Sequence, residues 1–274
     1  MATPQLLNDI ISVLLLLAPS AALLSLVLAG ISLRREGTMT LAIGGGFSKW
    51  MFWAVVFLTI QPLLRISIPG GVTRDISPAD ARRLRQTIAS VGREFAELAQ
   101  MILDTPSAQN RFESTGVLKT QVARDLAVVG PAARASGVHL DVRYNHPYGA
   151  YRGRPLEPVT YNYGDVLARA RVRIDETAAS VVLLDQVLED LPGGEISTGI
   201  NVLVDATGFS AVESPRGELL YWIEIRKGRI ARCHIKSPSF QNWPALPLTM
   251  HGNIIADFPL INKSFNLSYS GCDR

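Results

Sequence analysis

The sequence predicts a mainly helical α+β protein, a helical bundle with a small β-hairpin element, preceded by one or two membrane helices. Three observations lead to this prediction. The chain of 274 residues opens with a long uncharged stretch, continues with apolar residues at helical spacing, and later shows apolar residues at every second position. We divide it into a membrane anchor over residues 1–68 and a partial domain over residues 69–274.

The first apolar stretch, residues 10–33, reads IISVLLLLAPSAALLSLVLAGISL and contains no charged residue. A helix of this length rises about 1.5 Å per residue and so crosses a hydrocarbon core of about 30 Å. We interpret it as a membrane helix. A cleaved signal peptide is the less favoured alternative, because residues 1–9 contain no lysine or arginine and the apolar run is long. A buried helix of a soluble protein is a third interpretation.

The second apolar segment, residues 40–64, is interrupted only by Lys49. Its core is short for a membrane span, and tryptophans with a lysine at its entry are typical of the membrane interface. Basic residues at 34–35 and from Arg65 onward favour the same side of the membrane for both regions, which one span plus an interfacial helix satisfies. We therefore expect an inner (cytoplasmic) membrane location with the following domain on the cytoplasmic side.

Charge is spread evenly through the rest of the chain. Three of the 27 basic residues and two of the 24 acidic ones precede Arg65, so the remainder carries 24 − 22 = +2. Such a balanced segment has no basic patch, and nucleic acid is not an expected partner. The two cysteines, Cys233 and Cys272, lie 39 positions apart and form neither a CxxC pair nor a disulfide framework.

Two long helices are predicted in the second part. Ser77 and Pro78 form a typical helix start, a capping hydroxyl followed by proline at the first helical position. The apolar stripe that follows is Leu84, Ile88, Val91, Phe95, Leu98 and Ile102. A second helix over about 164–191 has the stripe Leu167, Ile174, Val181, Leu184, Leu188 and Leu191, and ends at a Pro-Gly-Gly sequence.

Residues 219–226 and 229–235 alternate in polarity and flank Lys227-Gly228, which predicts a β-hairpin. Within the second strand Cys233 shares a face with Ala231 and Ile235, so we expect Cys233 to be a small core residue. His234 points to the other face, which makes a metal shared by these two neighbours a poor candidate.

The strongest chemical candidate from the residues alone is the stretch Glu213-Ser214-Pro215-Arg216-Gly217-Glu218. Two interpretations remain open. The stretch is either a solvated turn with a surface ion pair, or it fixes the Arg216 guanidinium over a cavity between Glu213 and Glu218. Nucleotide-binding glycine motifs and histidine ligand spacings are absent from the sequence.

Several separated stretches resemble one known superfamily, and they follow that superfamily's order. It comprises the large subunit of membrane-bound energy-converting NiFe hydrogenases and the homologous D-type subunit of respiratory complex I, the NADH:quinone oxidoreductase. The resemblance covers about 205 residues. The stretches are GGVTRDI (70–76), NRFESTGVLKTQVARDLAVVGPAARASGVHLDVRYNHPYGAY (110–151), GDVLARARVRIDE (164–176), VESPRGEL (212–219), IKSPSFQNWPALP (235–247) and IADFPLINKSFNLSYSGCDR (255–274).

The resemblance implies a mainly helical fold with a small β element, and it divides on the metal. Hydrogenase subunits hold nickel and iron with two cysteine pairs, whereas complex I subunits lack these cysteines and help to form a quinone chamber. In this chain Ser268 and Gly271 occupy the carboxyl-terminal ligand positions, and Cys272 is one position away. The family's amino-terminal half, with the first cysteine pair, is absent. We therefore expect no metal ligands and no NiFe centre.

The same resemblance implies roles for four residues. Arg216 matches the arginine that overhangs the family's pocket and is the candidate catalytic residue. Glu213, Arg216, Ser237 and Ser239 are candidates for cofactor binding, with quinone as the ligand to consider. No cofactor bound by this chain alone is expected.

The resemblance leads to one favoured function and one alternative. We expect a component of a membrane-associated electron-transfer complex, with an iron–sulfur subunit and membrane subunits as partners and with no independent enzymatic activity. The alternative is a non-catalytic truncated or fused fragment of such a subunit.

Overall fold

The computed structural model describes residues 67–68, 71–154, 156–198 and 205–272. The predicted membrane helix at 10–33 and the apolar segment at 40–64 lie outside these residues. Within the described ranges, no helix combines the length and the apolarity that a membrane crossing requires. The anchor therefore stays a prediction.

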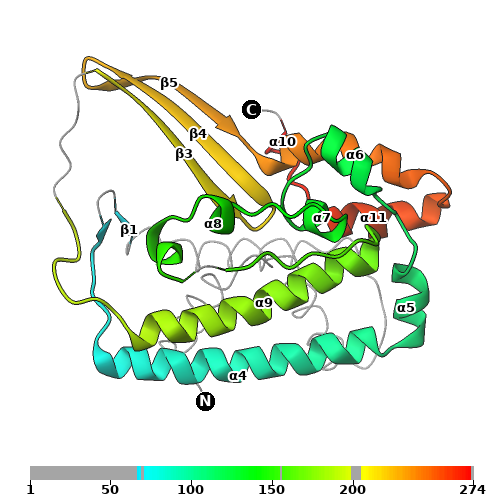
Figure 1. Cartoon of the computed structure of the whole chain (residues 1–274), viewed down its shortest axis with the longest axis horizontal. Helices are drawn as coiled ribbons and strands as arrows, with labels where there is room; N and C mark the ends of the chain where they lie inside the picture. Colours follow the sequence, from blue (N-terminus) through cyan, green and yellow to red (C-terminus); the bar gives the residue numbers. More distant parts are fainter. Residues whose placement is uncertain (1–66, 69–70, 155, 199–204, 273–274) are drawn as a thin grey trace, which may run out of the picture. The chain divides into compact units, whose positions relative to one another are not determined.

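The chain divides into two compact units, residues Met1–Gly92 with Leu184–Asn201 and residues Arg93–Leu183 with Val202–Arg274. The mixture of helices with antiparallel sheet confirms the predicted α+β class (Figure 1). In order, the elements are β1 Ser67–Ile68, β2 Gly71–Val72, α4 Pro78–Leu103, α5 Pro106–Phe112, α6 Thr120–Asp125, α7 Gly130–Ala135, α8 Val142–Asn145, η1 Gly149–Arg152, α9 Val166–Glu189, β3 Ala206–Ser214, β4 Gly217–Arg226, β5 Arg229–Lys236, α10 Pro238–Asn242, η2 Trp243–Ala245, η3 Pro247–Met250, η4 Ile255–Asp257 and α11 Phe258–Phe265.

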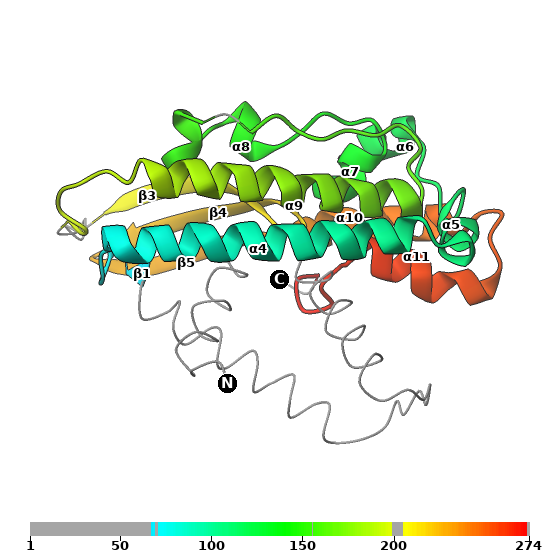
Figure 2. The ribbon, with the colours of Figure 1, turned by 90° about the horizontal axis from the view of Figure 1, so that it is seen from below.

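The first unit joins the start of α4 to the end of α9, which lie side by side in Figures 1 and 2. As predicted, α4 begins at Pro78, and the Ser77 hydroxyl accepts a hydrogen bond from the Asp80 amide at 3.1 Å. The Arg85 guanidinium connects the helices through Asp185, with Nε to Oδ1 at 2.7 Å.

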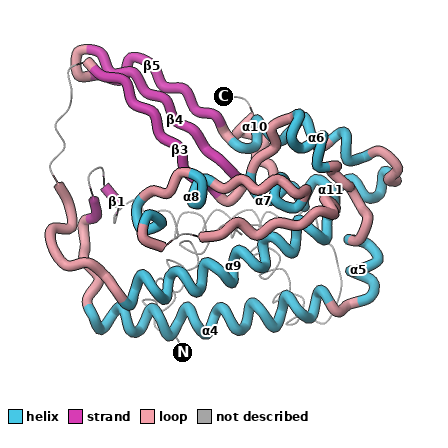
Figure 3. The backbone as a smooth tube through the Cα atoms, viewed as in Figure 1, coloured by secondary structure: helices cyan, strands magenta, loops and turns pink. Residues whose placement is uncertain are grey.

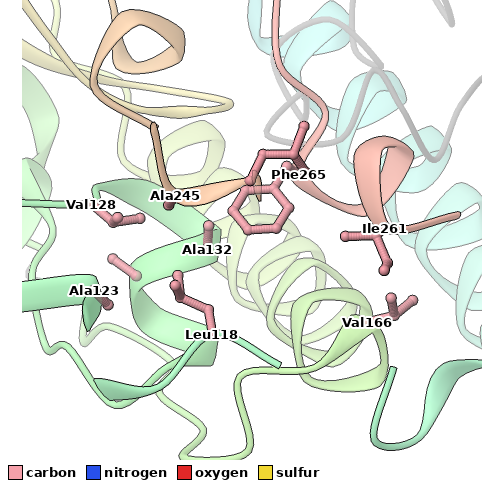
Figure 4. Close-up of a cluster of buried hydrophobic side chains, with 10 residues drawn as sticks. Leu118, Ala123, Val128, Ala132, Val166, Ala245, Ile261 and Phe265 are labelled. Atoms are coloured by element: carbon pink, nitrogen blue, oxygen red, sulfur yellow. The ribbon is translucent and has the colours of Figure 1, made fainter. Parts of the chain in front are cut away.

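In the second unit, the apolar core packs α6, α7 and the start of α9 against α11. Its buried members are Leu118, Ala123, Val128, Ala132, Ala133, Val166, Ala245, Leu246, Ile261 and Phe265 (Figure 4). Four of these ten residues are alanines, so the small side chains allow the short helices to approach closely. The position of α11 against α7 and α9 matters for the site, because the carboxyl-terminal tail leaves from α11.

The predicted hairpin forms with its turn at Lys227-Gly228, but it is part of a three-stranded antiparallel sheet, β3-β4-β5 (Figure 3). Strand β3 was not predicted. The prediction for Cys233 is wrong, because this residue is exposed. It lies on β5, an edge of the sheet, and the alternation that suggested a core face continues into a strand whose residues are mostly exposed.

The predicted helix at 164–191 exists as α9, but the face that it buries is not the predicted leucine stripe. The stripe residues are only half-buried, apart from Leu191, which is exposed. The fully buried face is the opposite, largely polar one and includes Arg169, Val172, Arg173, Glu176, Thr177 and Ser180. Periodicity of leucines therefore located the helix and misidentified its inner side, because buried charges with partners replace apolar contacts there.

Arg134 of α7 is the centre of this buried polar layer and is 1% exposed. Its guanidinium contacts Glu176 of α9 at 2.6 Å, Glu213 of β3 at 2.8 Å and Asp141 at 3.2 Å. Burial alone would lower the pKa of Arg134, but the three carboxylates outweigh it and hold this pKa above its ordinary value. The network thus connects a helix, a strand and a loop that are distant in sequence.

A backbone contact fixes the base of the sheet against α7. A Cβ at Gly130 would lie 2.3 Å from the carbonyl oxygen of Arg216 and 2.5 Å from the Cα of Gly217. Gly130 also has φ +71°, a left-handed value that glycine tolerates best. Both properties require glycine at this position, so the turn that carries Arg216 sits directly on the start of α7.

We predict that Gly130→Ala destabilises the protein far more than Gly228→Ala, measured as the free energy of unfolding in urea. The two glycines have matched φ values, +71° and +70°, but a Cβ at Gly228 meets nothing within 4 Å. Left-handed strain costs about 1–2 kcal/mol in both variants, and the clash at Gly130 adds roughly 1–3 kcal/mol. Equal losses would contradict the close approach.

We also predict that Arg134→Met lowers the free energy of unfolding by about 3–5 kcal/mol, because it leaves three buried carboxylates without their cation. Arg226→Met is the matched control. Arg226 pairs with Glu224 at 2.6 Å, but its side chain is 68% exposed, so its loss has a small effect. Comparable losses for the two variants would show that the Arg134 network does not hold the second unit together.

Candidate functional site

Arg216 lies in the turn between β3 and β4 and is half-buried. Its Nε–H donates a hydrogen bond to the carbonyl oxygen of Asn266, at the end of α11. Partial burial lowers the pKa of Arg216 below its ordinary value, and among the described residues no carboxylate pairs with it. The guanidinium is therefore held by a backbone carbonyl.

The flanking carboxylates do not hold Arg216, contrary to the second interpretation of the stretch from 213 to 218. Glu213 is buried and turned toward Arg134, and it also accepts a hydrogen bond from the Val142 amide at 3.2 Å. Burial raises the pKa of Glu213, and Arg134 opposes that shift. Since its carboxylate is used in this network, Glu213 stabilises the fold beside the site and does not line it with Arg216.

The last turn of α11 is surrounded by arginines from α9. Arg169 places its guanidinium 4.4 Å from the ring centre of Phe265 and donates to the Ser264 hydroxyl at 2.8 Å. Arg173 donates to the carbonyl oxygen of Phe265 at 3.4 Å. Burial lowers the pKa of Arg169 to about 9 and that of Arg173 to about 10, so both are cations at neutral pH. These cations lie where the helix dipole is negative.

Asn266 then ends α11 in the left-handed conformation, with φ 56°. This turn directs the following residues toward α10. The Ser268 amide donates to the Ser239 hydroxyl at 2.9 Å, and the Ser268 carbonyl accepts from Trp243 Nε1 at 3.3 Å. The ring of Trp243 also lies 5.4 Å from that of Tyr269. The tail is thus held largely through backbone groups.

The structure brings together all of the serines that the resemblance selected. Ser237 caps α10 by accepting from the Ser239 amide at 3.1 Å. The Ser268 hydroxyl accepts from the Gly271 amide at 3.2 Å. Together with Arg216, which contacts Asn266 in the same tail, these residues form one cluster that we call the tail cluster: Arg216, Ser237, Ser239, Ser268 and Gly271.

The tail cluster does not fit a nickel–iron centre. Thiolates are the ligands of such a centre in the family, and the two ligand positions here carry a hydroxyl and a hydrogen atom. In addition, a Cβ at Gly271 would lie 2.8 Å from the Ser237 hydroxyl oxygen, so the space of the second ligand side chain is taken. Within the described residues, no group of three histidine, cysteine or acidic side chains is arranged to hold a metal ion.

Sequence reasoning identified the serines and Arg216 but missed the residues that position them. Arg169 and Arg173 are four residues apart on α9 and precede Glu176, a pattern that places all three on one helical face. That face was overlooked because the leucines on the opposite side gave the stronger signal. Asn266 and Trp243 had no signal in the sequence, since their roles depend on the path of the tail.

Comparison with known proteins agrees with this arrangement. The chain is 33% identical over 211 residues to formate hydrogenlyase subunit 5 of Escherichia coli, covering 76% of this chain and 37% of the relative. It is 30% identical over 223 residues to the alpha subunit of the membrane-bound hydrogenase of Pyrococcus furiosus, covering 75% of this chain and 52% of the relative. The chain therefore spans between about a third and about a half of these two relatives.

An NADH-quinone oxidoreductase supplies a third relative. The chain is 30% identical over 234 residues to the first D-type subunit of this enzyme in Chloroherpeton thalassium, covering 75% of this chain and 53% of the relative. Similarity at this level thus extends to hydrogenases and to quinone oxidoreductases alike.

A solved structure, that of the membrane-bound sulfane sulfur reductase, an archaeal respiratory membrane complex, contains a similar chain. The match has a TM-score of 0.72 at 25% identity and covers 81% of this chain and 66% of the other. The family model described as "Respiratory-chain NADH dehydrogenase, 49 Kd subunit" matches residues 63–206 and 198–274, most of the sequence. The chain belongs to the family of the 49 Kd subunit of the respiratory-chain NADH dehydrogenase.

Proposed function

We propose that this chain is a component of a membrane-associated electron-transfer complex and that it acts without a nickel–iron centre. The observation that carries the proposal is the tail cluster. The carboxyl-terminal tail keeps a fixed path against α10, while the positions of the family's metal ligands hold Ser268 and Gly271. Such a subunit supplies shape and charge to an assembly, and the redox groups belong to its neighbours.

The partners that we propose are an iron–sulfur subunit and membrane subunits. The relatives support this assignment by their names, which are those of hydrogenase, formate hydrogenlyase and NADH-quinone oxidoreductase subunits. The apolar residues 10–33 would attach the chain to the inner membrane, with the described units on the cytoplasmic side.

Arg216, Ser237 and Ser239 are the residues that we propose for contact with a quinone. A guanidinium and two hydroxyls can donate hydrogen bonds to quinone oxygens. Arg216 is half-buried and free of carboxylates among the described residues, so its positive charge is available to a polar ligand. Glu213 is not proposed for this contact, because Arg134 occupies its carboxylate.

The alternative is a non-catalytic fragment of such a subunit, whose apolar surfaces lack their partners. Partial coverage of the relatives favours it, since the chain spans only 37% of formate hydrogenlyase subunit 5. On this alternative, exposed apolar side chains such as Met101 and Ile255 have no partner surface to cover them.

Purification of the tagged full chain from its native membranes distinguishes these functions. We expect iron–sulfur and membrane subunits to co-purify in fixed ratio and elemental analysis to find nickel far below one atom per chain. Stoichiometric nickel would refute the metal-free assignment. A chain that purifies alone from intact membranes would favour the fragment.

The packing of Gly271 against Ser237 gives a separate prediction about the tail cluster. We expect Gly271→Ala to lower the free energy of unfolding by about 1 kcal/mol, because the new Cβ displaces the hydroxyl that caps α10. Ser237→Ala alone should cost a similar amount. The double variant should cost no more than Ser237→Ala, and additive losses in this cycle would show that the two residues do not meet.

A further inference from the structure

Strand β5 is an edge of the three-stranded sheet, and among the described residues it pairs only with β4. Seven of its eight residues are exposed, Ile235 being the exception. An edge strand presents a row of unpaired backbone donors and acceptors, which can hydrogen-bond an additional strand.

The side chains of β5 have a regular charge pattern. Arg232, His234 and Lys236 follow one another at every second position and therefore lie on one face of the sheet. The strand contains no acidic residue. Glu224 of β4 lies 3.8 Å from Arg232, but it is already paired with Arg226 at 2.6 Å, so the face keeps an excess of positive charge.

The opposite face of β5 is apolar where the basic row is charged. Cys233 and Ile235 alternate with the three basic residues, and Cys233 is exposed. On the basic side, the sheet continues into an aromatic groove of about 300 Å³. Its lining includes Phe209, Leu220, Trp222, His234, Lys236 and Phe240. Phe209 is 68% exposed, so this face of the sheet is apolar, aromatic and open.

The other edge of the sheet is a weaker candidate for the same contact. The amide of Glu213, near the end of β3, donates to the Tyr148 hydroxyl at 3.2 Å, so part of that edge is already occupied. Glu213 is also the only charged residue of β3. A partner that reads a charge pattern has nothing to recognise there.

A second copy of this chain does not fit β5. Antiparallel pairing of two β5 strands would place arginines and lysines of one copy beside basic residues of the other, and like charges in adjacent strands are destabilising. Basic edge strands are a common device against self-association. The complementary strand is therefore an acidic one.

We infer that the outer edge of β5 binds an extended segment of a partner protein in which carboxylates alternate with apolar side chains. The carboxylates lie beside Arg232, His234 and Lys236, and the apolar side chains lie beside Cys233 and Ile235. Backbone hydrogen bonds to β5 give the affinity, and the alternation fixes the register. This inference does not depend on whether the chain takes part in electron transfer.

The test uses the purified full chain and a fluorescent peptide of about ten residues that alternates glutamate and valine, the length of a strand at the long end of the usual range. A control peptide has the same residues in two blocks, so its charge is equal and its alternation is lost. We expect the alternating peptide to bind at least about tenfold more tightly in fluorescence anisotropy and to protect β5 amides from hydrogen exchange.

Charge reversal on the strand, Arg232→Glu with Lys236→Glu, should weaken this binding about tenfold or more. The neutral pair Arg232→Gln with Lys236→Gln should give a smaller loss, which tests the idea even if the reversed variant folds poorly. The matched control is Lys119→Glu with Arg124→Glu, two exposed residues at α6, and it should bind like the wild type.

Equal affinity for the two peptides would overturn the inference, since charge alone would then explain binding. Absence of binding, or binding that both β5 variants retain, would overturn it as well. Sedimentation equilibrium covers the remaining occupant. A concentration-dependent dimer that disappears on charge reversal would mean that β5 pairs with a second copy.

Discussion

The buried guanidinium of Arg134 is the interaction on which the second unit depends. It has almost no contact with solvent, and its three carboxylate partners come from α9, from β3 and from the loop before α8. A charge removed from water is stable only when its partners are in place. The network therefore makes each of these elements a condition for the others, and it specifies their arrangement more strictly than apolar contacts would.

The same layer of charges extends to the carboxyl-terminal tail. Arg173 lies one helical turn before Glu176 on α9, and it contacts the last carbonyl of α11. Arg216 contacts the next residue along, Asn266, from the turn that rests on Gly130. The candidate site is thus built on the polar interior of the fold, and the position of Arg216 follows from packing at the base of the sheet.

Local patterns in the sequence were sufficient for the parts of this fold that local physics determines. The start of α4 at a capping serine, the long α9 and the turn at Lys227-Gly228 follow from short-range rules, and the structure has all three. The inner face of α9 could not be predicted in this way. Hydrophobic periodicity assigns leucines to the interior, whereas Arg169 and Arg173 are buried here because distant carbonyl groups receive their hydrogen bonds.

The candidate site shows the same division. The family motifs located Arg216 and the serines, because these residues occur in recognisable stretches. They assigned Arg216 two flanking carboxylates that it does not contact, because neighbours in sequence on a strand can point to different partners. Cys233 was misplaced for a related reason, since alternation along a strand shows which residues share a face and not whether that face is covered.

The way in which the tail is held has a consequence for the history of the family. Ser239 and Trp243 grip the main chain of Ser268, and the arginines around α11 hold carbonyl groups, so the anchoring contacts do not require thiols at positions 268 and 271. Replacement of metal-binding side chains at these positions would leave the path of the tail nearly unchanged. A descendant could therefore abandon metal chemistry without first acquiring compensating mutations, and its docking surfaces would persist for natural selection to reuse.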